Sequence, residues 1–311
     1  METIIKVENL KKNFKKKEVL KGVSFEVKRG QVFSLLGSNG AGKTTAVKIL
    51  STLLKFDEGS VSICGFDLAK EANKVRQVIS LTGQYAAIDE NLTGRENLHL
   101  IGALKKLPNY KEKSIEFLNM FELIDSADRR TKTYSGGMKR KLDISMSLLG
   151  DPKIIFLDEP TTGLDPQSRI ALWDMIKKLS KSGITIFLTT QYLDEAESLS
   201  DYIAVLNNGV VVAEGDTEEL KAKLPKGTIE ARFKHTAQMS EAATAIEKLN
   251  DIEFSKDEKA RTLIIKSDSG IEVLSKIIEA FKAIEAMPIS LEKKSASLEE
   301  VYLHLIGDKN D

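Results

Sequence analysis

The chain has 311 residues, of which 41% are apolar, so it is long enough to form two globular domains with substantial hydrophobic cores. Its 46 lysine and arginine residues balance its 46 aspartate and glutamate residues, so no global field attracts nucleic acid or anionic lipid, and we expect no nucleic-acid partner. The single cysteine, Cys64, excludes an intrachain disulfide and any cysteine-built zinc or iron–sulfur site. No window approaches the roughly 20 apolar residues that a membrane helix needs, which predicts a chain that is soluble by itself.

The first two thirds of the chain predict an α/β fold in which strands and helices alternate. A glycine-rich turn that runs into a helix occupies residues 38–54, and residues 90–150 have a helical pattern. The strands at 153–159 and 183–190 enclose a helix at 166–183, which predicts a parallel βαβ unit. Further strands are predicted where β-forming residues alternate or cluster, at residues 4–10, 23–37, 59–65, 78–84 and 202–215, the last a hairpin with the turn sequence NNG.

Residues 226–311 are predicted to form a second, smaller α+β domain, because the pattern changes at Pro225 and Gly227. The first domain then spans residues 1–222. The second domain has no recognisable catalytic set, and its amphipathic end, LEEVYLHLI, favours a docking helix in a regulatory or dimer-supporting domain. Its predicted order matches the ferredoxin-like β-α-β-β-α-β arrangement, with strands at 228–234, 252–256, 260–266 and 287–293 and helices at 237–249 and 270–283.

The stretch GSNGAGKT, residues 37–44, fits the phosphate-binding loop pattern between a strand and a helix. Gly37, Gly40 and Gly42 allow backbone N–H groups to converge on phosphate oxygens. Lys43 is expected to reach the β- and γ-phosphates, and Thr44 to offer its hydroxyl to Mg²⁺. The alternative is a solvated glycine turn.

The stretch IIFLDEP, residues 154–160, is an apolar strand that ends in two carboxylates. Asp158 and Glu159 must point in different directions, because neighbouring strand residues alternate faces and the chain turns at Pro160. One carboxylate can hold Mg²⁺ while the other accepts a proton from attacking water. Two carboxylates beside a triphosphate would repel it unless Mg²⁺ and Lys43 compensate. A helix cap is the alternative role for Glu159.

Two further polar positions are candidates for ligand binding. In YSGGMKRKLDIS, residues 134–145, Ser135, Gly136 and Gly137 stand at a helix start, which is either an ordinary N-cap or a second anion site. A second anion site makes sense if two copies face one another and each completes the other's nucleotide site. Gln191 follows the apolar strand IFLTT, where sheets of this kind bind ligands, although a capping or turn role is the alternative.

Together these residues resemble the nucleotide-binding subunits of ATP-binding-cassette (ABC) transporters. The motifs GSNGAGKT, YSGGM, IIFLDEP, GLDP and LTTQYLDEAE occur in the order of that family within residues 1–222. The resemblance implies a P-loop NTPase cassette with a RecA-like core, a helical subdomain at about residues 90–150 and an antiparallel β subdomain. It also implies a homodimer or paired cassette that closes over two Mg-ATP, and a separate integral membrane permease.

The resemblance also assigns roles to individual residues. Phe14 would stack on adenine, Gln84 would touch Mg²⁺ and sense the membrane subunit, and Asp165 in GLDP would lie at the dimer interface. Phe14 as plain core and Gln84 as a plain strand end are the alternatives. Asp158 would hold Mg²⁺ with Thr44, and Glu159, Lys43 and Gln191 would serve catalysis. The other residues expected at the nucleotide are Ser38, Asn39, Ala41 and Thr45.

Two departures from the family pattern narrow the resemblance. Tyr134 and Met138 replace the outer residues of the usual LSGGQ, and Gln191 stands where the family usually has histidine. With TGQYAAIDENLTGREN and SASLEEVYLHLIG, these features resemble the daunorubicin-resistance and sodium-export branch, in which glutamine is a familiar variant. Gln191 would then hydrogen-bond the γ-phosphate or the attacking water, and its neutral amide cannot relay a proton.

We therefore expect the ATP-hydrolysing subunit of an exporter of drugs, ions or lipid-like molecules, peripheral on the cytoplasmic face of the cell membrane. Glu159 would be the general base or the residue that positions water. The competing class is a cassette ATPase that acts on a macromolecular partner such as the ribosome or DNA. A third class, a nucleotide-binding regulatory module without turnover, is opposed by the intact Glu159.

Overall fold

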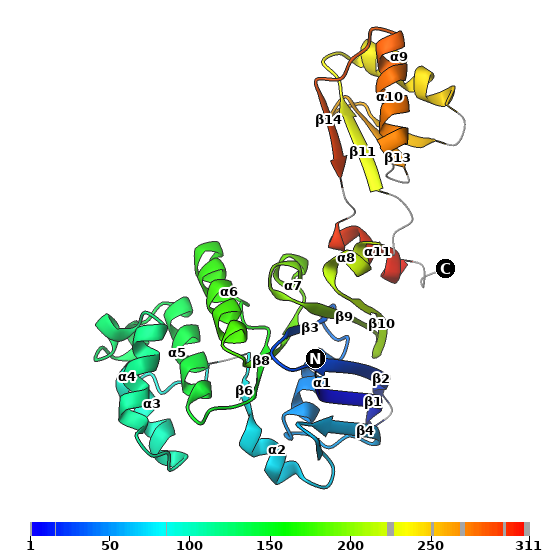
Figure 1. The fold of residues 1–311 in the computed structure, drawn as a ribbon. Helices are drawn as coiled ribbons and strands as arrows, with labels where there is room; N and C mark the ends of the chain where they lie inside the picture. Colours follow the sequence, from blue (N-terminus) through cyan, green and yellow to red (C-terminus); the bar gives the residue numbers. More distant parts are fainter. Residues whose placement is uncertain are drawn as a thin grey trace. The chain divides into compact units, whose positions relative to one another are not determined.

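The computed structural model describes residues 2–15, 17–84, 86–222, 227–249, 252–267, 271–294 and 297–307. The chain divides into two compact units, Met1–Thr217 and Glu218–Asp311 (Figure 1). The division lies just before the boundary at residues 222–226 that the sequence predicts. None of the helices in the described ranges is both long and apolar enough to cross a membrane.

The first unit contains a six-stranded sheet with the strand order β10-β9-β3-β8-β7-β6. All neighbouring pairs in it are parallel except β9 and β10, which form the predicted hairpin with Asn208 and Gly209 at positive φ. β3, β7 and β8 are buried along their whole length, as their continuous apolar runs require. The bounds are β3 (Val32–Leu36), β6 (Ile79–Thr82), β7 (Ile154–Asp158), β8 (Thr185–Thr190), β9 (Tyr202–Asn207) and β10 (Val210–Gly215).

Three helices follow strands of this sheet, and each begins beyond the carboxyl end of its strand. α1 (Lys43–Leu50) follows β3, and α7 (Leu193–Leu199) follows β8. α6 (Pro166–Lys181) connects β7 to β8, which pair in parallel, so the predicted βαβ unit is confirmed. Because β3, β7 and β8 are parallel, the loops that leave their carboxyl ends meet at one edge of the sheet.

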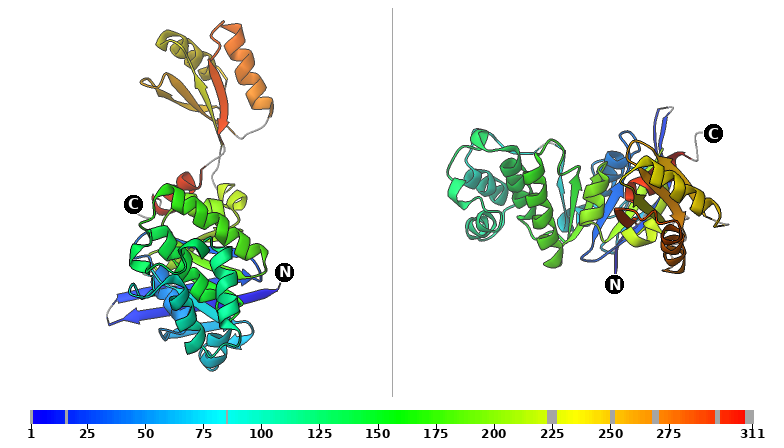
Figure 2. Two further views of the ribbon diagram at one scale, coloured as in Figure 1. Left: turned by 90° about the vertical axis from the view of Figure 1, so that its left-hand side faces the viewer. Right: turned by 90° about the horizontal axis from the view of Figure 1, so that it is seen from above.

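A four-stranded antiparallel sheet and a group of helices complete the first unit. The sheet has the order β2-β1-β4-β5, and α2 (Ala72–Val78) follows it. α3 (Gly94–Leu104), α4 (Tyr110–Met120) and α5 (Gly136–Leu148) form the helical subdomain predicted at about residues 90–150, which gathers at one end of the unit in Figure 2. The strand bounds are β1 (Thr3–Phe14), β2 (Lys17–Lys28), β4 (Glu58–Ile63) and β5 (Phe66–Asp67).

The second unit has the predicted ferredoxin-like arrangement. Its sheet is antiparallel throughout, with the order β12-β13-β11-β14, and α9 and α10 pack on one face (Figure 1). Phe233 and Phe281 are fully buried in its core, with ring centroids 5.6 Å apart. The bounds are α8 (Thr217–Lys221), β11 (Gly227–Arg232), α9 (Thr236–Glu247), β12 (Glu253–Asp257), β13 (Thr262–Ser267), α10 (Ile271–Ala283), β14 (Ser290–Lys294) and α11 (Leu298–Gly307).

Candidate active site

The loop between β3 and α1 has the backbone conformation of a phosphate cradle. Gly42 is the N-cap of α1 at φ 113°, and a Cβ there would lie 2.8 Å from Cδ2 of Leu20. A Cβ on Gly37 would lie 2.3 Å from the carbonyl oxygen of Leu206, so neither position accepts a larger residue without rearrangement. Because glycine brings no side chain to cap the helix, the N–H groups of the first turn of α1 are left for an anion.

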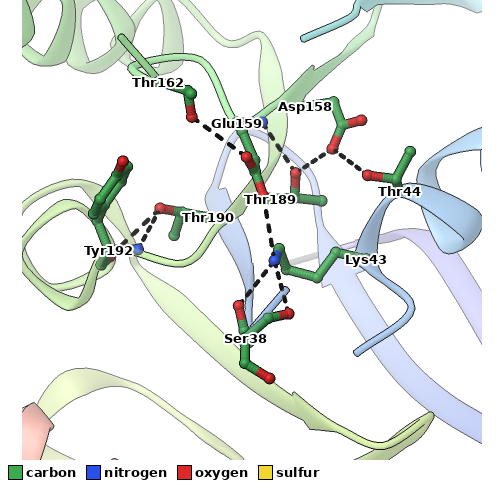
Figure 3. A network of polar contacts seen from close by, with 10 residues as sticks. Ser38, Lys43, Thr44, Asp158, Glu159, Thr162, Thr189, Thr190 and Tyr192 are labelled. Atoms are coloured by element: carbon green, nitrogen blue, oxygen red, sulfur yellow. Dashed lines mark hydrogen bonds and ion pairs between the residues drawn. The ribbon is translucent and has the colours of Figure 1, made fainter. Parts of the chain in front are cut away.

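Lys43, the first residue of α1, points back across this loop (Figure 3). Its Nζ donates to the carbonyl oxygens of Gly37 at 2.8 Å and Ser38 at 3.1 Å, and it forms an ion pair with Oε1 of Glu159 at 3.3 Å. The Lys43 side chain is only 4% exposed. The structure therefore places a buried cation beside the loop that the sequence predicts to bind phosphate.

Asp158, the last residue of β7, faces the same loop from two strands away in the sheet (Figure 3). Its Oδ1 accepts from Oγ1 of Thr44 at 3.3 Å and from Oγ1 of Thr189 at 2.6 Å. A hydroxyl and a carboxylate held together fit Mg²⁺, which takes oxygen ligands and binds through one or two carboxylates plus substrate phosphates. Thr44 and Asp158, two of the predicted metal residues, therefore lie together.

Glu159 leaves the strand in a left-handed conformation with φ 47°, which is uncommon for a residue other than glycine. Its N–H donates to both the carbonyl oxygen and Oγ1 of Thr189, each at 3.1 Å, which holds this conformation. Its Oε2 accepts from Oγ1 of Thr162 at 3.3 Å, whereas the Asp158 carboxylate accepts from Thr44 and Thr189, so the two carboxylates have different partners. The capping alternative for Glu159 is wrong, because Asp165 caps the next helix, α6, by accepting from the N–H of Ser168 at 2.9 Å.

The loop opens into a cavity of about 260 Å³. Phe14 is 45% exposed at the end of β1, so the core alternative for this residue is wrong. A larger hollow of about 680 Å³, with Lys6 and Glu26 among its lining residues, has no residue of the phosphate loop in its wall. The smaller cavity is lined by Lys17, Val19, Asn39, Gly40, Gly42, Lys43, Thr44, Thr45 and Glu159.

Ser135 lies outside this cavity, at the start of α5. Its Oγ accepts from the N–H of Met138 at 3.2 Å, so it is an N-cap as the plain alternative requires, and both Ser135 and Gly136 are exposed. Tyr134 is buried, and its hydroxyl donates to the carbonyl oxygen of Ser126 at 2.6 Å. The buried ring and its hydrogen bond allow tyrosine to replace the usual leucine, while Ser135 and Gly136 remain at the surface.

The two predicted glutamines also lie outside the cavity lining. Gln84 is exposed just after β6, and Gln191 is half-buried just after β8. Within the described residues the Gln191 side chain has no hydrogen-bond partner, and the N-cap of α7 is Tyr192. The N–H of Tyr192 donates to Oγ1 of Thr190 at 2.9 Å, which closes a turn around Gln191 (Figure 3). Gln191 is therefore in a turn, as one of the two alternatives requires, but it is not the cap of α7.

Sequence reasoning missed several residues that the structure brings to the site. Thr189 connects Asp158 to the backbone of Glu159, and Thr162 contacts the Glu159 carboxylate. The threonine pair in IFLTT was a usable signal, because polar side chains at the end of a buried strand need partners. Lys17 stands in a lysine-rich run and gave no signal of its own.

Comparison with known proteins identifies the family. A family model for ABC transporters matches residues 20–162. The daunorubicin resistance ATP-binding protein DrrA3 of Streptomyces coeruleorubidus is 42% identical over 311 residues, covering 99% of this chain and 97% of that protein. The chain belongs to the ABC transporter family. It is the ATP-binding subunit of a drug-resistance or export-type transporter, and it is an ATPase.

Two further comparisons agree with the ABC assignment. The linearmycin resistance ATP-binding protein LnrL of Bacillus subtilis is 33% identical, over 98% of each chain. A solved dimeric ATP-binding cassette in a post-hydrolysis state, bound to ADP and Pi, is 28% identical with a TM-score of 0.62, over 68% of this chain and 98% of that chain. The first relative shares both units of this ABC protein, whereas the solved cassette matches about the length of the first unit.

Proposed function

We propose that two copies of this chain, or this chain and a second cassette, close over two Mg-ATP and drive an integral membrane permease. The observation that supports this most directly is the separation of the two helix starts that we assign to phosphate binding. The phosphate loop, Thr44 and Glu159 line one cavity, and Asp158 contacts Thr44, whereas the Ser135 end of α5 is exposed outside it. A second cassette would bring its own Ser135 to the open side of that cavity.

The size of the cavity supports such a split site. Its volume of about 260 Å³ falls below the roughly 300 Å³ at which pockets for drug-sized ligands begin. A nucleotide would therefore remain partly uncovered on one cassette. The solved relative that is dimeric and holds ADP and Pi also supports a paired arrangement. Asp165, at the start of α6, would lie at the interface between the two cassettes.

The residues of this chain have distinct roles toward ATP. Lys43 would donate to the β- and γ-phosphates, together with backbone N–H groups of the loop and the first turn of α1. Phe14 would stack on adenine. Thr44, Asp158 and Gln84 would hold Mg²⁺, which would offset the negative charge of the phosphates. The loop residues concerned are Gly37, Ser38, Asn39, Gly40, Ala41, Gly42 and Thr45.

Hydrolysis would rest on three groups that act on water and on the γ-phosphate. Glu159 would accept a proton from the attacking water, and its left-handed backbone directs its carboxylate toward the phosphate loop. Gln191 would donate from its amide to the γ-phosphate. Ser135 of the opposite cassette, with Gly136 and Gly137, would complete the charge stabilisation from a helix start.

Transport itself would require a permease, and this subunit would then lie on the cytoplasmic face of the cell membrane. The names of the relatives associate them with resistance to daunorubicin and linearmycin, which supports drug-like or lipid-like efflux. The helical subdomain offers a surface for the permease. Leu100 and Leu104 are 44% and 70% exposed one turn apart on α3, so they form an apolar stripe that a partner would cover.

Light scattering of the Glu159→Gln variant tests the split site. With Mg-ATP the variant should bind nucleotide, lose nearly all turnover and accumulate as a dimer. Adding Ser135→Arg should abolish the dimer while ATP binding remains, because Ser135 is needed only for the opposite nucleotide. A Glu159→Gln protein that stays monomeric at saturating Mg-ATP, or a Ser135→Arg change without effect, would overturn the proposal. Co-purification of a membrane protein with the tagged chain separates a transporter subunit from an ATPase that acts on macromolecules.

A further inference from the structure

The core-facing side of α5 carries a buried ion pair that has no part in the roles assigned above. Nη1 of Arg140 lies 3.3 Å from Oδ2 of Asp143, and the two side chains are only 6% and 7% exposed. The pair lies next to the Gln84 segment, by which we mean Gly83, Gln84, Ala86 and Ala87. Buried charges need partners, so their contacts indicate what they hold in place.

The two charges contact the Gln84 segment on either side of Gln84. Nη1 of Arg140 donates to the carbonyl oxygen of Gly83 at 2.7 Å. The N–H of Ala87 donates to Oδ1 of Asp143 at 3.1 Å. Both hydrogen bonds are part-buried and join a charged side chain to the backbone, and bonds to charged groups are stronger than neutral ones. The backbone that carries Gln84 is therefore fastened to α5 at two points.

The same arginine also reaches the catalytic strand. Nη2 of Arg140 lies 3.5 Å from the carbonyl oxygen of Asp158, at the end of β7. Burial lowers the pKa of the Arg140 guanidinium, and the nearby charge of Asp143 acts in the opposite direction. Arg140 thus joins α5, the Gln84 segment and the Asp158 backbone through one planar group with several donors.

We propose that Arg140 and Asp143 are positioning residues that couple the two nucleotide sites of the dimer through Gln84. This inference rests on the split site proposed above. Ser135, which would bind the opposite cassette's nucleotide, begins the helix whose next turns carry Arg140 and Asp143. Five residues of helix correspond to about 7.5 Å, so Arg140 lies close to that helix start along a rigid element. A displacement of α5 by the opposite nucleotide moves the backbone on both sides of Gln84, which serves this chain's own Mg-ATP.

The double variant Arg140→Met/Asp143→Leu tests the inference because it removes both charges and preserves side-chain bulk. Replacing a complete buried ion pair with apolar residues is often neutral for stability, whereas removing one partner is not. Lys141→Met is the matched control: Lys141 is the next residue on α5, and its Nζ pairs with Oε2 of Glu122 at 2.9 Å. We expect the double variant to lose at least tenfold in kcat, with an ATP Kd within twofold of wild type, and the control to change neither.

Hydrogen exchange of residues 80–90 separates positioning from a purely structural role. In the Glu159→Gln background, ATP-induced dimerisation should protect this region, and the double variant should form the dimer without that protection. Equal protection in both proteins, or a normal kcat in the double variant, would overturn the inference while the dimer itself still supports the split site. If the double variant does not fold, Arg140→Lys decides, because lysine has one nitrogen in place of the two, Nη1 and Nη2, that contact Gly83 and Asp158. It should lower kcat with an unchanged ATP Kd, and normal turnover there would also overturn the inference.

Discussion

Lys43 and Glu159 form a buried ion pair, with Nζ 3.3 Å from Oε1 and the two side chains 4% and 10% exposed. The cation expected to hold the β- and γ-phosphates is thus engaged by the carboxylate expected to accept a proton from water. With these proposed roles, ATP would compete with Glu159 for Lys43. Phosphate oxygens that take over the ammonium would release the Glu159 carboxylate for water, so nucleotide binding itself would prepare the proposed base.

The first prediction concerns ATP affinity in the Glu159→Gln variant. Glutamine removes the competitor for Lys43 and one negative charge beside the triphosphate, so the affinity of the variant should exceed that of wild type. A several-fold decrease in Kd corresponds to about 1 kcal/mol, a modest share of what a close charge pair contributes. Titration with a fluorescent ATP analogue without Mg²⁺ measures the monomer. Glu112→Gln, an exposed carboxylate on α4, is the control and should bind like wild type. An unchanged or weaker affinity in the Glu159 variant would argue against the competition.

The second prediction concerns Gln191, whose side chain has no partner in the described part of the chain. If its amide contacts the γ-phosphate or the attacking water, its loss removes interactions that strengthen in the transition state. Gln191→Ala should lower kcat by about tenfold to a thousandfold, the scale of one lost preorganised donor, while ATP still binds. Steady-state turnover and nucleotide titration measure the two effects separately.

The matched variant Gln191→His restores a donor at the same place. It should retain activity and add a pH dependence near neutrality, because imidazole titrates there and the amide does not. Turnover of wild type and both variants from pH 6 to 9 distinguishes the cases. Unchanged turnover in Gln191→Ala would remove this residue from the reaction.

Sequence alone predicted the elements whose patterns depend on burial. β3, β7 and β8 are buried throughout and were recognisable as apolar runs, and glycine positions marked the phosphate loop between β3 and α1. The second half of β1 and the start of β2 were missed. Lysines are so frequent between Lys11 and Lys21 that apolar and polar residues do not alternate as a strand pattern requires. Each strand is 12 residues long and alternates exposed and buried positions only in part.

Contacts between distant segments could not be predicted from local patterns. Arg140 and Asp143 sit three residues apart on α5, a spacing equally typical of a surface ion pair. Their partners Gly83 and Ala87 contribute only backbone atoms, which carry no side-chain signal. The left-handed conformation of Glu159 was likewise hidden, because it depends on Thr189 from the neighbouring strand.

The third prediction concerns removal of the second unit. The two core clusters of the first unit draw only on residues up to Val211, and a separate cluster around Phe233 and Phe281 serves the second. A protein truncated after residue 225 should therefore fold and bind ATP like the full chain, but differ in dimer stability or in coupling to the permease. Nucleotide titration and light scattering of the Glu159→Gln form report the two properties. A folded truncation that fails to bind ATP would refute the assigned roles of the two units.

The last prediction concerns the pH dependence of stability through Glu195 on α7. Glu195 is fully buried, Oε1 accepts from Nε1 of Trp173 at 3.3 Å, and within the described residues Oε2 has no hydrogen-bond partner. Burial raises the pKa of this carboxyl above its ordinary value of 4.5, and the side chains of Thr190, Thr161 and Trp173 lower it by less. The folded state therefore holds a proton that the unfolded chain releases, so stability falls as pH rises above 4.5 until the folded carboxyl also ionises.

Glu195→Gln resembles the protonated carboxyl at every pH and should remove this loss. Its Tm should exceed that of wild type at pH 7.5 by about 2–4 °C, which corresponds to about 1 kcal/mol for a domain of this size. The difference should shrink as pH falls toward 4.5, because the wild-type carboxyl is then protonated in both states. Thermal unfolding from pH 4.5 to 8 measures it, with Glu116→Gln, an exposed residue of α4, as the control. A Tm difference that does not depend on pH, or a variant less stable than wild type at pH 7.5, would mean that Glu195 is ionised and paired in the folded protein.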